Sequence, residues 1–155
     1  MFQYAKILRA LVATLALSMA AGCAEQSSPP PQTAAGTSPE LAGAWYQIYF
    51  DTNSVNIDAR GRAIVKNVAY VVANAGPTRV TVIGRTDRVG APPANLALSH
   101  RRADAVRDAL ITAGVPAASI DTSWTGEAKQ AVATANDAAE PRNRVVDVTV
   151  VKETP

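Results

Sequence analysis

Residues 84–106 read GRTDRVGAPPANLALSHRRADAV and contain a change from one hydrophobic period to another. Just before them, Arg79–Gly84 alternates branched apolar residues with other side chains, as a half-buried strand does. Residues 85–93 include Gly90 and a pair of prolines and predict a loop. Apolar residues then recur at helical spacing, at Leu98, Val106, Ala109, Leu110 and Ala113. The stretch therefore predicts a strand, a loop and a helix in succession.

The same two periods alternate on either side of this stretch. Strand patterns occupy 45–50, 120–125 and 144–151, and a helical pattern occupies 64–75. Asp58 is a candidate N-cap for that helix, and Gly76-Pro77 is a stop signal. The Ala-, Asn- and Asp-rich residues 128–141 predict a long loop. The order strand, helix, strand, helix, strand, strand predicts an α/β (α+β) sandwich, in which helices pack on one face of one mixed sheet.

The N-terminal residues have the order of a secretion signal. Lys6 and Arg9 precede an apolar run at 10–17, and small residues follow up to Cys23. The run is shorter than the about 20 residues that a membrane-spanning helix needs. We therefore expect residues 1–22 to be a signal peptide.

Cys23 is the only cysteine, so no intramolecular disulfide can form. The run Ala20–Cys23 resembles a bacterial lipobox, with Ala20 in place of the usual Leu. We therefore expect acylation of Cys23, for example by palmitate. Acyl chains contribute about 0.8 kcal/mol per buried methylene to membrane binding, so they would hold the protein at a membrane. Ala24 implies the outer membrane, by resemblance to sorting rules in Gram-negative bacteria. The alternative is a soluble periplasmic protein with an unpaired thiol.

Residues 23–43 separate this cysteine from the first strand pattern. Ser, Pro, Thr, Ala, Gly and Gln dominate residues 24–43, where only Glu25 and Glu40 are charged. This composition predicts a disordered tether. Residues 44–152 are then left as one domain with one core.

The charge balance excludes one class of partner. The chain has 15 basic and 13 acidic side chains, but Lys6 and Arg9 lie in the expected signal peptide. The mature chain therefore has 15 − 2 = 13 basic and 13 acidic residues and is neutral. Nucleic-acid binding would call for a basic surface and is not expected. His100 is the only histidine, so no metal site is expected either.

Residues 84–106 also carry a motif. They resemble the signature of the OmpA-like domain, Gly-x-Thr-Asp-x-x-Gly followed by Asn-x-x-Leu-Ser-x-x-Arg-Ala-x-x-Val, with every fixed position filled. Residues 49–54, 126–127 and 140–145 are similar to further segments of that family. The resemblance implies that residues 44–152 are an OmpA-like, peptidoglycan-binding domain in a lipoprotein of the OmpA/Pal type.

The resemblance also implies a ligand and its site. In that family, the Asp of the first motif and the Arg of the second hold diaminopimelate, and they correspond to Asp87 and Arg102. A carboxylate can accept from a ligand ammonium, and a guanidinium can hold a ligand carboxylate. Thr86, Asn95 and Asn53 are expected to support the pocket, and Asn95 is also a candidate helix cap. In the alternative, Asp87 caps the loop and Arg102 is merely its ion-pair partner.

Arg101, Arg85 and Ala94 lie close to the predicted site residues in the sequence. Arg101 should point about 100° away from Arg102 around the helix, and we expect it to lie outside the site. Arg85 and Ala94 depart from the family pattern, which has His or Tyr and Tyr at these positions. Arg85 is expected to place an extra cation beside the pocket, where it would assist a ligand carboxylate or compete for Asp87.

Three classes of function are open. The first is a non-catalytic outer-membrane lipoprotein that faces the periplasm, binds peptidoglycan and tethers the outer membrane to the cell wall. The second is a protein-interaction module of the same fold for envelope partners such as a Tol-like system, and Arg85 and Ala94 would favour it. The third is a hydrolase that uses Asp51, Asp58 or Asp87 as an acid. No nucleophile stands with a base or metal set beside these residues, so neither enzymatic activity nor a cofactor is expected.

Replacing Cys23 by Ala should abolish acylation and release the protein from the outer-membrane fraction. The reason is that acyl chains on this residue are the only membrane attachment we expect. Metabolic labelling with a fatty-acid analogue, followed by membrane fractionation, measures both effects. Equal labelling of the parent chain and the variant would show that Cys23 is not the modified residue.

Overall fold

A computed structural model describes residues 43–153, and the expected signal peptide, Cys23 and most of the tether lie outside this range. The helices and strands within it follow in the order β1 (Ala44–Tyr49), α1 (Ala59–Ala75), β2 (Thr78–Arg85), α2 (Pro92–Thr112), β3 (Ile120–Gly126) and β4 (Val145–Lys152). Short 3₁₀ turns at Ala117–Ser119 and Pro141–Asn143 precede β3 and β4. The expected order of elements and the α+β class are confirmed.

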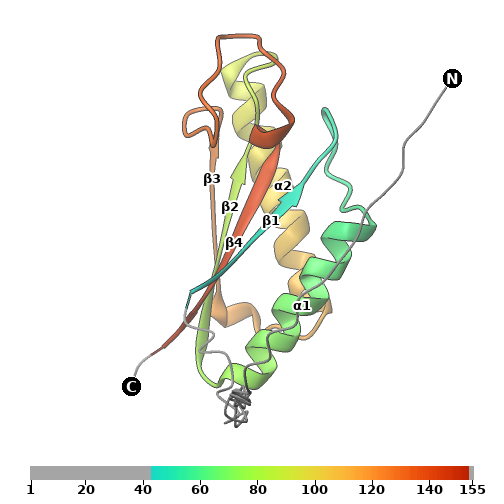
Figure 1. The fold of residues 1–155 in the computed structure, drawn as a ribbon, viewed down its shortest axis with the longest axis vertical. Coiled ribbons are helices and arrows are strands. Elements are labelled where there is room, and N and C mark those ends of the chain that lie inside the picture. The colour runs from blue at the N-terminus through green and yellow to red at the C-terminus, as the bar shows by residue number, and fades with distance from the viewer. Residues whose placement is uncertain (1–42, 154–155) are drawn as a thin grey trace, which may run out of the picture. The chain divides into compact units, whose positions relative to one another are not determined.

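The strands form one mixed sheet in the spatial order β1-β4-β2-β3. β2 and β3 are parallel, and α2 is the crossover between them, while β4 runs antiparallel to both β1 and β2. As a consequence β1, β2 and β3 end at one edge of the sheet, where β4 begins, towards the top of Figure 1. The loops that leave this edge bring together segments far apart in the sequence.

Local signals explain where the two helices begin. The Asp58 carboxylate accepts from the backbone N–H of Gly61 at 2.6 Å and caps α1, as predicted. Helix α2 instead begins at Pro92, where the missing N–H costs nothing. The predicted capping role of Asn95 is therefore wrong: its Nδ2 donates to Glu127 Oε2 at 2.6 Å, at the end of β3.

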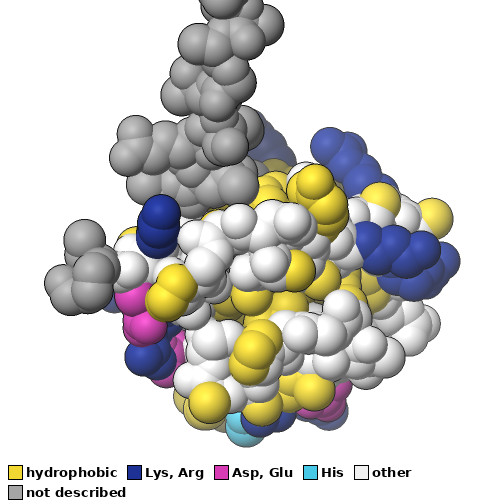
Figure 2. Space-filling view, turned by 90° about the horizontal axis from the view of Figure 1, so that it is seen from below, with side chains coloured by type: hydrophobic (Ala, Val, Ile, Leu, Met, Phe, Trp, Pro, Cys, Tyr) yellow, Lys and Arg dark blue, Asp and Glu magenta, His cyan; other side chains and the backbone are white. Residues whose placement is uncertain are grey.

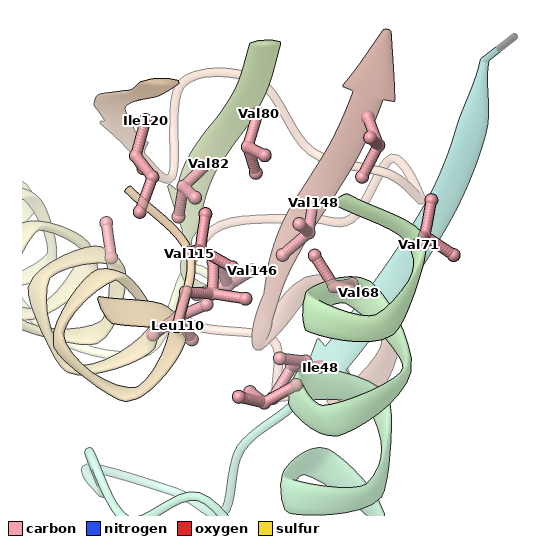
Figure 3. Packing of buried hydrophobic residues seen from close by; sticks show 14 of the residues in the cluster. Ile48, Val68, Val71, Val80, Val82, Leu110, Val115, Ile120, Val146 and Val148 are labelled. Atoms are coloured by element: carbon pink, nitrogen blue, oxygen red, sulfur yellow. The ribbon is translucent and has the colours of Figure 1, made fainter. Parts of the chain in front are cut away.

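The core lies between the sheet and both helices. Val146, Val148 and Val150 point from β4 towards the helices and are completely buried. Figure 3 shows Val68 of α1 and Leu110 of α2 on the side of the sheet to which Val146 and Val148 point. Burying each such side chain contributes roughly 1.5–3 kcal/mol. Both helices thus cover the same face of the sheet, as expected.

Gly84 allows α2 to lie directly on β2. A Cβ atom at this position would lie 2.0 Å from the backbone oxygen of Ser99. At Gly126, at the end of β3, a Cβ would lie 3.1 Å from the backbone of Leu96, which is a tight contact but not a clash. The first half of α2 is therefore held against the edge of the sheet from which the Asp87 loop emerges.

Replacing Gly84 by Ala should destabilise the domain by about 3 kcal/mol, the upper end of the usual cost of overpacking, because a backbone oxygen blocks the new methyl group. Urea denaturation measures the loss. Ser123→Ala, at an exposed position on the neighbouring strand β3, is the control and should change stability by less than about 0.5 kcal/mol. A Gly84→Ala variant as stable as this control would contradict the close approach of α2.

Candidate functional site

A pocket of about 290 Å³ lies at the edge of the sheet where β1 and β2 end. Its walls come from the loop after β1, the loop after β2 and the first half of α2. The structure brings four of the predicted site residues together in this lining: Asn53, Asp87, Asn95 and Arg102. The pocket therefore combines a carboxylate and a guanidinium.

Arg102 is completely buried at the base of the pocket. Its Nε donates to the backbone oxygen of Ser54 at 2.9 Å and its Nη2 to that of Asp51 at 2.9 Å. Its Nη1 donates to the backbone oxygen of Arg85 at 3.3 Å, and its Cζ lies 5.1 Å from the centre of the Phe50 ring. Burial lowers the pKa of Arg102 to about 10, so it is still charged at neutral pH.

Asp87 is also buried, but its ion-pair partner is not Arg102. Arg144 Nη1 lies 3.1 Å from Asp87 Oδ2, and the same oxygen accepts from the backbone N–H of Glu140 at 3.4 Å. The alternative in which Arg102 is the ion-pair partner of Asp87 is therefore wrong. Among the described residues Asp87 Oδ1 accepts no hydrogen bond, so this oxygen is free for a ligand.

The three supporting residues occupy different positions. Asn53 is exposed in the pocket wall with a φ of 51°, a conformation that Asn tolerates better than most residues. Asn95 lines the pocket and ties α2 to the end of β3. Thr86 is buried outside the lining, and its backbone N–H donates to the Gly126 oxygen at 2.9 Å. Thr86 thus holds the loop to β3 without forming a wall of the pocket.

Two expectations about neighbouring arginines are wrong. Arg101 is exposed, as a solvated charge is expected to be, but it belongs to the lining of the pocket. Arg85 does not stand beside the pocket: its Nε pairs with Asp147 Oδ2 at 2.8 Å, and its Nη1 donates to the Lys129 oxygen at 2.7 Å. Asp147 lies on the face of β4 that points away from the helices, so Arg85 is engaged on the other side of the sheet.

Sequence reasoning also missed the role of Arg144. Its partner Asp87 lies 57 positions away, and no periodicity or local motif connects the two. The Nε of Arg144 donates to the Phe50 oxygen at 3.2 Å as well. Only the placement of β4 beside β1 and β2 brings these groups together.

A larger groove lies away from this pocket, between α1 and α2. It has a volume of about 640 Å³ and is lined mainly by small or apolar residues such as Val65, Ala69 and Ala109. Arg62 and Lys66 are among the other lining residues. Figure 2 views the domain from below, at the end opposite the candidate pocket, and shows apolar side chains gathered around a hollow. The groove lining contains no carboxylate, so it lacks the paired charges of the smaller pocket.

Residues 43–153 contain no group of three His, Cys, Asp or Glu side chains placed to hold a metal ion. No helix in this range is both long enough and apolar enough to cross a membrane.

The fold and the pocket define a small α+β domain with a charged pocket at the end of a helix-covered sheet. The model of the OmpA family matches residues 49–144. The chain belongs to the OmpA family.

Individual relatives agree with this assignment. An outer membrane protein of Gluconacetobacter diazotrophicus is 37% identical over 109 residues, which are 66% of this chain and 29% of that protein. A peptidoglycan-associated lipoprotein of Pasteurella multocida is 36% identical over 105 residues, or 68% of this chain and 70% of that protein. The chain therefore spans less than a third of the first relative and most of the second.

A solved structure has the same fold. The peptidoglycan-associated lipoprotein of Burkholderia pseudomallei superimposes with a TM-score of 0.62 at 29% identity. The match covers 67% of this chain and 88% of that one. The OmpA-like fold expected from the motif is thus confirmed.

Replacing Arg102 by Ala should lower the free energy of unfolding by about 3–5 kcal/mol, because it leaves a cavity and removes the donor from three backbone oxygens. Arg101→Ala is a matched control at the next position and should change stability by less than about 0.5 kcal/mol. Thermal and urea denaturation measure both. Equal effects of the two substitutions would show that the guanidinium of Arg102 does not hold these loops.

Proposed function

We propose that this domain binds peptidoglycan without catalysis, and that the pocket holds the diaminopimelate residue of a stem peptide. The observation that carries the proposal is the buried Asp87 carboxylate, with one oxygen free among the described residues, in the same pocket as the buried Arg102 guanidinium. The opposite charges of the pocket correspond to those of a zwitterionic ligand.

The chemistry of the two groups explains which end of the ligand each would bind. Diaminopimelate carries an ammonium and a carboxylate on one carbon at the end of its side chain. Asp87 Oδ1 can accept from the ammonium, and a guanidinium can donate to the carboxylate. Arg102 has five N–H donors and uses three of them on backbone oxygens, so two are left for a ligand.

Arg101 adds a second cation to this site. Arg101 is exposed and belongs to the pocket lining, whereas Arg102 is buried. We assign Arg101 to the outer oxygen of the ligand carboxylate and Arg102 to the inner one. The proposed site thus has three charged residues, one more than the predicted pair.

The relatives support binding to the cell wall. Two of them are named peptidoglycan-associated lipoprotein, and the Pasteurella multocida protein is matched over 70% of its length. We extend that association to this chain, and with it an outer-membrane location in which the domain faces the periplasm. Acyl chains on Cys23 would anchor the protein, and the next twenty residues would reach on the order of 25 Å as a coil and about 60 Å if extended.

Of the two residues that would favour a protein-interaction module, only Ala94 lies in the pocket lining. Arg85 was expected to alter the pocket, but its guanidinium is engaged by Asp147 and Lys129. Ala94 does lie in the lining, where a small side chain leaves the entrance open. A module that binds Tol-like partners instead of the wall is therefore left as an outcome of the test below.

Replacing Asp87 by Asn should weaken retention on purified sacculi by about ten- to a hundredfold, which corresponds to the loss of one charge-assisted hydrogen bond. The amide keeps the shape of the carboxylate and an oxygen for the Glu140 N–H, but it has no charge for the ligand ammonium. Co-sedimentation with sacculi over a range of protein concentrations measures the affinity. Asp104→Asn is the control, because Asp104 is a half-exposed carboxylate on α2 outside the pocket lining.

Folding is checked alongside, since the substitution also removes the charge that faces Arg144. A folded Asp87→Asn variant that is retained like the parent chain would refute the diaminopimelate assignment. The partner-binding module would then be the better hypothesis.

A further inference from the structure

A second pocket adjoins the first across the Asp87–Arg144 ion pair. It has a volume of about 260 Å³. Arg144 lies in its lining, while Asp87 lines the first pocket. Only 3.1 Å separates Arg144 Nη1 from Asp87 Oδ2, so the partition between the pockets is narrow. The other walls come from the end of β1, the segment before α1 and the turn before β4, and they include Tyr49, Asp51, Asn56, Asp58, Pro141 and Arg142.

The backbone between the two pockets is held from both sides. Arg144 Nε donates to the Phe50 oxygen at 3.2 Å, and Arg102 Nη2 donates to the Asp51 oxygen at 2.9 Å. The segment Phe50–Asp51, which lines the second pocket, is therefore tied directly to Arg102, which lines the first.

The cations of the second pocket are already neutralised by the protein. Arg142 donates from Nε and Nη2 to the two oxygens of Glu140, at 2.9 and 2.8 Å. These hydrogen bonds lower the pKa of Glu140 to about 2. Arg144 is paired with Asp87 through a single contact from Nη1 to Oδ2. An anionic ligand would find no free cation here and would face the carboxylates of Asp51 and Asp58.

The acceptors of the pocket are less engaged. Within residues 43–153, no hydrogen bond involves the Asp51 carboxylate or the side-chain amide of Asn56, and both residues are exposed. Asp58 uses Oδ1 to cap α1. A cationic ligand would meet the guanidinium groups of Arg142 and Arg144, so the lining best suits a neutral ligand with several hydroxyl or amide donors.

Tyr49 supplies an apolar surface beside these acceptors. Its side chain is exposed, and its hydroxyl donates to Gln47 Oε1 at 2.7 Å, which restricts the ring. An aromatic ring next to carboxylate and amide groups fits a pyranose, which has hydroxyl groups around its edge and C–H groups on its faces. Sites for drug-sized ligands have volumes of about 300–1,000 Å³. The volume of the second pocket is smaller than this and suits a single sugar ring.

We propose that the second pocket is a subsite for one N-acetylated sugar ring of the wall glycan, next to the stem peptide whose diaminopimelate occupies the first pocket. This inference rests on the proposed function. Diaminopimelate is the third residue of the stem, and three extended residues span on the order of 10 Å. That length crosses the narrow partition between the two pockets.

The test compares two soluble probes by calorimetric titration of the folded protein. One probe is a stem peptide that contains diaminopimelate, and the other is the same peptide attached to the wall disaccharide. The parent chain should bind the disaccharide probe about three- to tenfold more tightly, the size of one or two neutral hydrogen bonds. Tyr49→Ala and Asn56→Ala should each reduce this advantage and leave the affinity for the free peptide unchanged.

Trp45→Ala is the matched control, because Trp45 is an exposed aromatic residue on the same strand and the same face as Tyr49 but outside both linings. It should keep the full advantage of the disaccharide probe. Equal binding of the two probes by the parent chain would overturn the subsite and leave the proposed function standing. Equal weakening of both probes by Tyr49→Ala would also overturn it, and binding of neither probe would refute the proposed function and the subsite together.

Discussion

The burial of one guanidinium organises the functional end of this domain. An arginine removed from water is costly unless its donors are satisfied, and Arg102 satisfies three of them with backbone oxygens of Asp51, Ser54 and Arg85. These oxygens belong to the loop after β1 and to the end of β2, while Arg102 itself belongs to α2. The three segments therefore meet at a single side chain, and the pocket forms where they meet.

A second arginine extends this frame to β4. Arg144 binds the Phe50 oxygen through Nε and Asp87 through Nη1, so the Asp87 carboxylate is oriented by protein groups before any ligand arrives. Orienting a charged group in advance lowers the entropy lost on binding. The close packing at Gly84 serves the same purpose, because it presses α2 against β2 and sets the position of the loop that carries Asp87.

The charged residues of the lining distinguish the first pocket from the groove between α1 and α2. The groove between α1 and α2 is larger, but its lining has basic side chains without carboxylates. The smaller pocket combines Asp87 with Arg101 and Arg102, which suits a zwitterionic ligand. The proposed binding of diaminopimelate therefore depends on local complementarity of charge and needs no basic surface.

Local sequence patterns predict the class and order of the elements, because each element has a local cause. Alternating valines mark β4, Asp58 caps α1, and the motif of residues 84–106 points to Asp87 and Arg102. Which charges meet depends on the tertiary structure. Arg144 pairs with Asp87 and Arg85 pairs with Asp147, because β4 lies between β1 and β2 in one register. Ion-pair partners depend on that register, which the whole sheet selects and no local pattern encodes.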